Sequence, residues 1–340
     1  MRTIRNTLLR ISTISFRRLF DCIDLVHRDS KKAKLYIFLD MILCYIRYGT
    51  GYLDYLTFGF VHLKAPVRKT YMSMNKNLAL VRRLNNPDYR AFIDDKSEFN
   101  RLFSDLLGRD WIDLRKTDSD SFLAFVEKHK VVYAKPTLAF GGKGIRRIEY
   151  SNQKDSVGLY DELVSLGIFD VEEQIVQHPR MSLLSGSSVN SLRITTLLVD
   201  SVVSILYTLV RIGDGSNYVD NISSGGMYCP VDDNGIISAD AFCDAKVEYY
   251  ENHPKTATKF KGFLIPLYEE AIALVKKAAL RIPEIRYIGW DVAITEDKPV
   301  LIEGNVIPGY DMPQNYRHLG ETKVGILPKI HSILKDELTN

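Results

Sequence analysis

The chain has 340 residues, of which 46% are hydrophobic and 26% are charged, and its formal net charge is +3. A chain of this length and composition can bury a large core divided among two or three lobes, which excludes an intrinsically disordered protein. So small a net charge, without an arginine-rich or aromatic stacking motif, argues against nucleic-acid binding. The four cysteines show neither Cys-x-x-Cys spacing nor histidine partners, which fits a reducing compartment: Cys22, Cys44, Cys229 and Cys243.

Residues 1–70 are predicted to form a helical N-terminal region. Its first twenty residues contain five arginines and no acid, and they include no apolar stretch of signal-peptide length, so we expect a cytoplasmic protein. Such a basic start is compatible with contact to an anionic membrane at its inner face. More commonly, such a segment forms a solvated helix that packs on its own domain.

Two apolar features of this region are predicted to belong to the core. Residues 35–46 are interrupted by Asp40 and fall short of the ~20 residues that a membrane span needs, so we expect a buried helix there. An aromatic series follows this segment and is typical of core packing: Tyr45, Tyr48, Tyr52, Tyr55 and Phe58.

Residues 71–130 are predicted to be a linker region of short elements. A helix begins near Asp95 or Ser97, either of which can cap it, and a second amphipathic helix covers 118–130. A strand is expected at 111–114, between these two helices.

Later segments predict strands and one long helix. Residues 192–210 are rich in β-branched side chains and are interrupted near Asp200-Ser201, which predicts two adjacent strands. Residues 266–281 predict a helix, because Pro266 suits a first turn and apolar residues follow along one face.

A lysine on a predicted strand precedes a glycine-rich loop. Lys135 ends the β-rich run 131–136, and Gly141, Gly142, Lys143 and Gly144 follow before a second strand. Glycines let backbone amides approach phosphate oxygens. The loop is not a Walker A motif, because Lys143 is followed by glycine. Taken alone, the pattern is also typical of a Gly-Gly hairpin turn.

The segment 288–305 predicts two short antiparallel strands joined by a turn at 296–299. Side chains alternate along a strand, so Glu303 and Asn305 share one face, and the turn places Asp291 across from Glu303. Two carboxylates and an amide oxygen are ligands that magnesium accepts. The pattern therefore favours a metal–nucleotide site, although an isolated hairpin of this kind is more often solvated.

Together these segments resemble the ATP-grasp superfamily, and in particular its sugar-transfer-associated proteins found among exopolysaccharide genes. The resemblance covers most of the chain from about Tyr48 onward, with the motifs in the order of the family. Besides the lysine–glycine and acidic segments, the matching motifs are Asp95-Lys96, 171–179, 188–193, 221–226 and His253-Pro254.

The resemblance implies an α+β ATP-grasp fold with two lobes that clamp ATP and two Mg²⁺ ions. Residues 131–180 would be the small lobe, with the glycine loop as a lid, and 181–340 the large lobe with the metal site. Lys96 and Lys135 would contact phosphate. Glu172 or Glu173 would open the adenine hinge, whose register stays open by one residue. The hinge itself would be Gln174, Ile175, Val176 and Gln177.

Arg193 and Lys135 are the candidate catalytic residues. A guanidinium suits an acyl phosphate and a tetrahedral oxyanion, although an internal salt bridge is the alternative for Arg193. No histidine belongs to a recognisable nucleophilic triad. By analogy with the family, the substrate side would contain Asn221, Ser223, Ser224, Gly225 and His253, although residues 221–226 are equally typical of a plain turn.

The resulting prediction is an ATP-dependent carboxylate–amine ligase that works through an acyl phosphate, in surface polysaccharide or related metabolite biosynthesis. Its partners would be small-molecule or glycan-linked carboxylates and amines. One alternative is an ATP-grasp kinase that phosphorylates a hydroxyl group. Another is a non-catalytic nucleotide-binding module of a glycan synthesis complex. The sequence indicates neither the substrates nor the oligomeric state.

Overall fold

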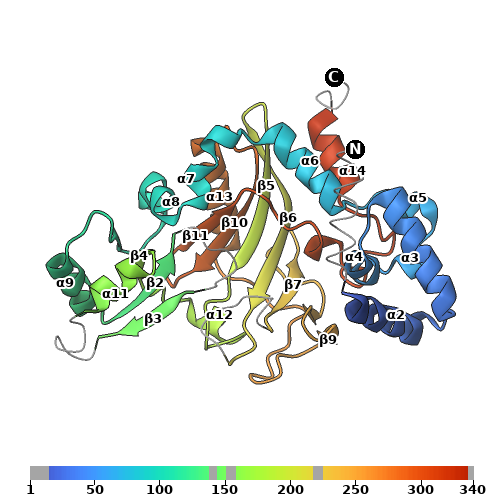
Figure 1. Cartoon of the computed structure of the whole chain (residues 1–340), viewed down its shortest axis with the longest axis horizontal. Coiled ribbons are helices and arrows are strands. Elements are labelled where there is room, and N and C mark those ends of the chain that lie inside the picture. The colour runs from blue at the N-terminus through green and yellow to red at the C-terminus, as the bar shows by residue number, and fades with distance from the viewer. Residues whose placement is uncertain (1–14, 138–143, 151–157, 217–224, 336–340) are drawn as a thin grey trace. The chain divides into compact units, whose positions relative to one another are not determined.

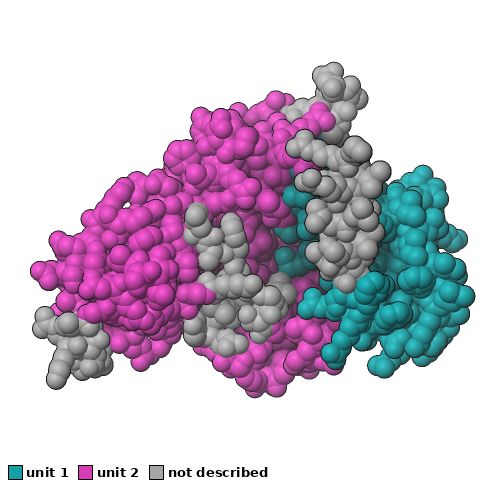
Figure 2. Space-filling model, in the orientation of Figure 1, with its two compact units in different colours: residues 1–79, 309–340 teal, residues 80–308 magenta. Residues whose placement is uncertain are grey.

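The computed structural model describes residues 15–137, 144–150, 158–216 and 225–335. They form two compact units, which Figure 2 distinguishes by colour. Unit 1 contains residues 1–79 and 309–340, and unit 2 contains residues 80–308. The chain is a mixture of helices and sheets with a helical N-terminal region, as the sequence predicted.

Unit 1 is helical in the part that the structure describes. Ser15 caps its first described helix by accepting a hydrogen bond from the backbone N–H of Arg18. Gly49, in the left-handed region, ends α3. The elements are α2 (Phe16–Ser30), α3 (Lys34–Tyr48), α4 (Tyr52–Thr57), η1 (Phe60–His62), α5 (Ala65–Arg68), η5 (Met312–Gln314) and α14 (Leu327–Leu334), and the chain crosses into unit 2 within α6 (Met74–Leu84).

An aromatic cluster forms part of the core of unit 1. Tyr48, Tyr55 and Phe58 are buried, as the sequence predicted, and Tyr45 is exposed. Phe60 and Tyr71 complete the cluster with an edge-to-face contact at 5.2 Å between ring centroids.

A buried ion pair fixes the orientation of α3. Arg68 donates hydrogen bonds to Oδ1 and Oδ2 of Asp40 at 2.8 Å and 2.7 Å, and the hydroxyl of Tyr55 donates to Oδ2 at 2.6 Å. Burial raises the pKa of Asp40, but these hydrogen bonds outweigh it and hold the pKa below its usual value. Asp40 is therefore an inward-facing anion.

This ion pair corrects the prediction for residues 35–46. They do form a helix, but the helix is not buried all round, because Asp40 faces the core and Leu35, Leu39 and Ile46 face solvent. None of the helices in the described ranges has both the length and the apolar character that a membrane crossing requires.

The smaller sheet of unit 2 is antiparallel, with strand order β1-β4-β2-β3. Its strands β2, β3 and β4 are labelled in Figure 1. Helices α9 (Ser119–His129) and α11 (Leu159–Ser165) pack on it around Phe122, Val132 and Leu163. The strands are β1 (Trp111–Asp113), β2 (Val131–Pro136), β3 (Arg146–Glu149) and β4 (Ile168–Glu173).

The larger sheet has the order β11-β10-β5-β6-β7-β8-β9. Helix α13 (Tyr268–Arg281) packs against β5, β10 and β11 (Figure 1), with Trp290 fully buried in the shared core. The strands are β5 (Leu192–Val199), β6 (Val202–Ile212), β7 (Met227–Val231), β8 (Ala241–Cys243), β9 (Glu248–Tyr250), β10 (Tyr287–Ile294) and β11 (Pro299–Asn305).

The cap of α8 and the turn between β5 and β6 agree with the predictions from the sequence. Asp95 caps α8 (Lys96–Leu102) by accepting from the N–H groups of Ser97 and Glu98 at 2.9 Å and 3.2 Å. The turn between β5 and β6 places Asp200 and Ser201 at positive φ, as a tight hairpin requires. The remaining elements are η2 (Pro87–Tyr89), α7 (Ala91–Asp94), η3 (Ser104–Leu106) and α12 (Pro179–Ser182).

Residues 309–340 belong to the same unit as the N-terminal helices. Gln314, which is fully buried, accepts from the N–H of Met72 at 2.8 Å and donates to its carbonyl at 3.1 Å. This link joins residues 242 positions apart, so no local sequence pattern predicts it. The predicted lobe boundaries at residues 70, 130 and 180 stay predictions.

We expect Arg68→Met to destabilise unit 1 by about 3–5 kcal/mol, because it leaves the Asp40 carboxylate buried without its cation. The matched control is Arg47→Met, an exposed change on α3 that we expect to cost less than about 0.5 kcal/mol. Hydrogen exchange in Arg68→Met should accelerate in α3 and α5 more than in β10. Exchange at the wild-type rate in α3 would contradict the structural role of the pair.

Candidate functional site

The strands β10 and β11 bring the three predicted metal ligands together. Asp291 lies directly opposite Glu303, and Gly289 lies opposite Asn305, in an antiparallel pairing. The predicted pairing is therefore confirmed, while the role of these residues in metal binding stays a prediction.

Two arginines bind Asp291, which is fully buried. Arg193, opposite it on β5, donates through Nε to Oδ1 and through Nη2 to Oδ2, the latter at 3.0 Å. Arg211 on β6 donates to Oδ2 at 2.7 Å. The internal salt bridge considered for Arg193 is thus present, and its partner is the predicted metal ligand. Burial raises the pKa of Asp291, but the two guanidinium groups outweigh it and lower the pKa.

Glu303 has the opposite electrostatic environment. Its carboxyl group interacts directly with that of Asp291. Burial and this neighbouring carboxylate raise the pKa of Glu303, against the attraction of Lys96. Because the ionised form of Glu303 is destabilised, a metal ion bound beside it would stabilise that form. The side-chain amide of Asn305 donates to the carbonyl of Gly289 at 3.4 Å, so its oxygen is the atom suited to a metal. Glu303 and Asn305 therefore fit Mg²⁺ directly, and Asp291 would first have to exchange an arginine contact.

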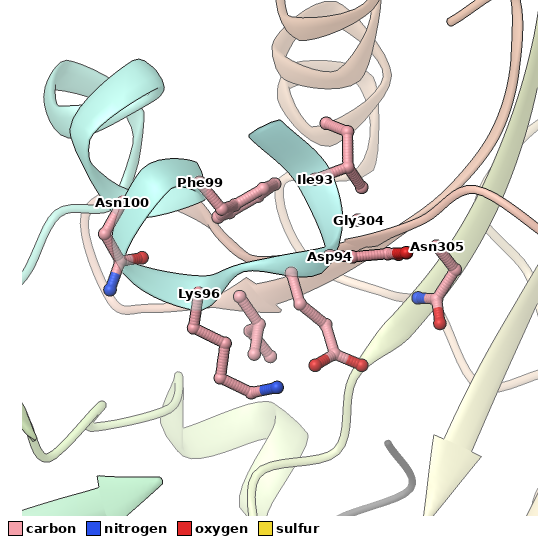
Figure 3. A pocket seen from close by; sticks show the side chains of 9 residues that line it. Ile93, Asp94, Lys96, Phe99, Asn100, Gly304 and Asn305 are labelled. Carbon is pink, nitrogen blue, oxygen red and sulfur yellow. The ribbon is translucent and has the colours of Figure 1, made fainter. Parts of the chain in front are cut away.

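A pocket lies between α7, α8 and β11. Lys96 extends from the first turn of α8, and Asn305 lies at the end of β11 (Figure 3). The structure thus places a predicted phosphate-binding lysine beside two predicted metal ligands. The lining residues are Ile93, Asp94, Lys96, Phe99, Asn100, Ile302, Glu303, Gly304 and Asn305.

Lys135 belongs to a neighbouring buried network that is centred on Glu172. The Lys135 ammonium group donates to the Glu172 carboxylate. Arg109 donates to it through Nε at 2.7 Å, and Asn100 donates at 3.0 Å. Asn100 also donates to Asp170 at 2.9 Å. The network therefore joins β2, β4 and α8.

Arg109 extends this network to the metal strand. Its Nη1 donates to the carbonyl of Leu301 at 2.5 Å and its Nη2 to that of Ile302 at 3.3 Å, both on β11. The guanidinium group is buried, so these contacts are shielded from water. Arg109 thus fixes the distance between Glu172 and the strand that carries Glu303.

Asp170 and Glu172 share one face of β4, but their pKa values are shifted in opposite directions. Burial and the neighbouring Glu172 raise the pKa of Asp170 well above its usual value. Burial also opposes ionisation of Glu172, but Arg109 and Lys135 outweigh it and lower its pKa. The ionised form is therefore favoured at Glu172 and disfavoured at Asp170.

The orientations of the two hinge candidates also differ. Glu172 faces the buried network, whereas Glu173 is partly exposed and lies 3.3 Å from His129. Residues 174–178 have no regular secondary structure. The side chain of Gln177 donates to the carbonyls of Ser185 and Ser188 at 3.0 Å and 2.8 Å, so it braces a loop. Adenine recognition by backbone groups of Gln174, Ile175, Val176 and Gln177 stays a prediction.

Several predicted residues are placed elsewhere or are not described. Gly141, Gly142, Lys143, Asn221, Ser223 and Ser224 lie outside the described residues. Gly144 and Gly225 have φ of +77° and +96°, which favour glycine. The ring of His253 is buried, with Nε2 2.9 Å from the carbonyl of Gly213 and Nδ1 accepting from the N–H of Thr256 at 3.1 Å. Neither nitrogen is left for a substrate, which argues against the predicted contact.

Sequence reasoning missed four residues of these networks: Asn100, Arg109, Asp170 and Arg211. The Asp-Val-Glu pattern at 170–172 was a usable signal, since alternate residues of a strand share a face. Arg109 and Arg211 carried no such signal, because their partners are far away in the sequence.

A model of the sugar-transfer associated ATP-grasp family matches residues 75–320. The match covers more than half of the chain, which therefore belongs to the sugar-transfer-associated ATP-grasp family, as its motifs predicted. A comparison with curated proteins finds no match.

Among solved structures, the chain is similar to the ATP-grasp ligase PsnB in complex with precursor peptide PsnA2 and AMPPNP (14% identity, TM-score 0.44, 74% of this chain and 61% of that one). It is also similar to D-alanyl-alanine synthetase A from Vibrio cholerae O1 biovar eltor (12%, 0.44, 75% and 68%). A third is the D-cycloserine synthetase DcsG (13%, 0.44, 77% and 79%). The chain spans only 61% of the length of the PsnB structure. Similarities this low carry no argument about activity.

Two isosteric substitutions on β4 should have opposite effects on stability. Asp170→Asn keeps an acceptor for Asn100 and removes a carboxyl group whose ionisation is disfavoured by burial and by Glu172. The pKa of Asp170 is raised in the folded state, so the native protein binds a proton at this carboxyl group more tightly than the unfolded chain does. The wild type therefore loses stability as the pH rises above the pKa that Asp170 has in the unfolded chain. We expect the free energy of unfolding of Asp170→Asn to match the wild type at about pH 4, near the unfolded pKa of an aspartate, and to exceed it at about pH 7.

Glu172→Gln should instead destabilise the protein by roughly 3 kcal/mol at neutral pH, because Arg109 and Lys135 lose their carboxylate. Chemical denaturation of both variants at the two pH values tests the assignment. If Asp170→Asn were the more destabilised of the two, the charge would lie on Asp170 and the assignment would be wrong.

Proposed function

We propose that the chain is an ATP-dependent carboxylate–amine ligase that forms an amide through an acyl phosphate. The observation that carries the proposal is the pocket in which Lys96 from α8 meets Glu303 and Asn305 from β11. A cation for phosphate oxygens and hard oxygen ligands for a metal thus line the same pocket. The chain that contains this pocket belongs to the ATP-grasp family.

The residues of this pocket have distinct roles in the proposal. Glu303 and Asn305 would hold Mg²⁺, which neutralises and orients phosphate oxygens when it is bound. Lys96 would add positive charge on the phosphate chain from the opposite side of the pocket. Phosphoryl transfer needs positioning and charge neutralisation more than covalent help from the protein, so this set of groups suits it. The number of metal ions proposed is two.

Lys135 and Arg193 would act from positions held by ion pairs. Glu172 fixes the Lys135 ammonium group at the end of β2, close to the predicted glycine lid in the sequence. Asp291 holds the Arg193 guanidinium group beside Glu303. Exchange of this contact for an acyl phosphate oxygen would let Arg193 stabilise the charge that develops at the carbonyl.

The substrates in the proposal are a carboxylate and an amine, free or linked to a glycan, in surface polysaccharide or related metabolite synthesis. A carboxylate must be activated because oxide is a poor leaving group. The acyl phosphate provides phosphate as the leaving group when the amine attacks. Contact of the basic N-terminal residues with a membrane also stays a prediction, since residues 1–14 lie outside the described part of the chain.

Product analysis separates this proposal from a kinase. Amino acids and uronic acids are incubated in pairs with ATP and Mg²⁺, and the products are identified by mass spectrometry. A ligase releases free phosphate only when both carboxylate and amine are present, and its product has the mass of an amide. A product that keeps the phosphoryl group would establish the kinase alternative. Absence of any ATP turnover with all pairs would favour a nucleotide-binding module.

We expect Glu303→Gln to reduce turnover by roughly 100-fold or more, because the variant loses the anionic metal ligand. The fold should persist, since the change removes a partly buried carboxyl group whose ionisation is disfavoured by desolvation and by its neighbour Asp291. The matched control is Glu296→Gln, an exposed acid in the turn of the same hairpin. Wild-type turnover in Glu303→Gln would refute the metal assignment.

A further inference from the structure

The outer face of α3 is apolar along its whole length. Leu35, Leu39, Ile42, Leu43 and Ile46 are between 42% and 75% exposed, and they repeat at helical spacing over about 16 Å. We call these five residues the α3 apolar face.

This exposure follows from the way in which α3 is anchored. The inward side carries Ile37, Asp40, Cys44 and Tyr48, at a spacing of three or four residues. The Asp40–Arg68 ion pair and the hydrogen bond from Tyr55 fix that side toward the core. Turning the helix to cover the apolar face would break them, so the face stays outside.

The exposed charged side chains of α3 are basic. The only acid on α3 is the buried Asp40, while Lys34 and Arg47 are exposed in its first and last turns. Lys34 forms an ion pair with Asp24 of α2 at 2.6 Å, so Arg47 is the basic side chain that α3 contributes. On α2, which packs against α3, Phe16 and Phe20 are exposed next to Arg17 and Arg18. Aliphatic and aromatic side chains flanked by basic residues are the features of a helix that lies in the interface of an anionic membrane.

The size of the face argues against a second copy of the chain as its occupant. Stable interfaces bury about 800 Å² per partner from roughly 20–30 residues. The α3 apolar face contains far fewer residues and no polar group to form the hydrogen bonds of a protein interface. A lipid surface needs neither, because burial of the apolar side chains and attraction to anionic headgroups both contribute to binding.

We propose that α3 docks unit 1 on an anionic lipid surface, with Leu35, Leu39, Ile42, Leu43 and Ile46 inserted at the level of the headgroups. Arg47, Arg17 and Arg18 contact lipid phosphates. The inference is independent of the reaction that the chain catalyses.

The full chain is tested by flotation with vesicles of phosphatidylglycerol and phosphatidylcholine, and with vesicles of phosphatidylcholine alone. We expect binding to the anionic vesicles that weakens as salt is raised. The double variant Leu39→Gln/Ile46→Gln should lose roughly tenfold or more of this binding, because both side chains belong to the inserted face. Its melting temperature should stay unchanged, since both positions are exposed.

The matched control is Leu166→Gln/Val202→Gln, which changes two exposed apolar residues of unit 2 and should bind as the wild type does. Failure of the wild type to bind anionic vesicles, or equal binding by Leu39→Gln/Ile46→Gln, would overturn the proposal. So would light scattering that shows a dimer of the wild type and a monomer of this variant, since the face would then join two copies.

Discussion

The Glu172 carboxylate accepts hydrogen bonds from three side chains that come from different parts of unit 2. Lys135 lies on β2, Asn100 on α8 and Arg109 just before β1, and Arg109 continues to carbonyl groups of β11. A buried carboxylate with three donors tolerates little movement, because loss of any donor leaves charge exposed to an apolar interior. The relative positions of Lys96, Lys135 and Glu303 therefore depend on one acid that need not touch a substrate.

The carboxyl groups of Asp291 and Glu303 are outnumbered by the cations that act on them. These cations are Lys96, Arg193 and Arg211. A site with an excess of positive charge attracts anions more strongly than metal ions. We expect phosphate groups and magnesium to enter together, since each supplies the charge that the other needs in this pocket.

The sequence predicted those parts of the structure that local patterns determine. The pairing of Asp291 with Glu303 followed from the two-residue period of strands and a short turn, and the cap at Asp95 followed from its position before α8. The direction in which α3 faces could not be predicted, because it depends on a partner 28 residues away, Arg68. For the same reason Arg109 and Arg211 were missed: their importance arises from contacts with residues that only the fold brings near.

Unit 1 is built from two segments that lie far apart in the sequence, and this affects the order in which the chain can fold during synthesis. Residues 309–335 follow all of unit 2, so the N-terminal helices leave the ribosome long before Gln314 can bind the backbone of Met72. All the residues of unit 2 are available earlier, and domains generally fold as units during synthesis. The N-terminal helices must therefore wait with part of their core unfilled. In that interval the surface that residues 309–335 later cover is exposed to solvent.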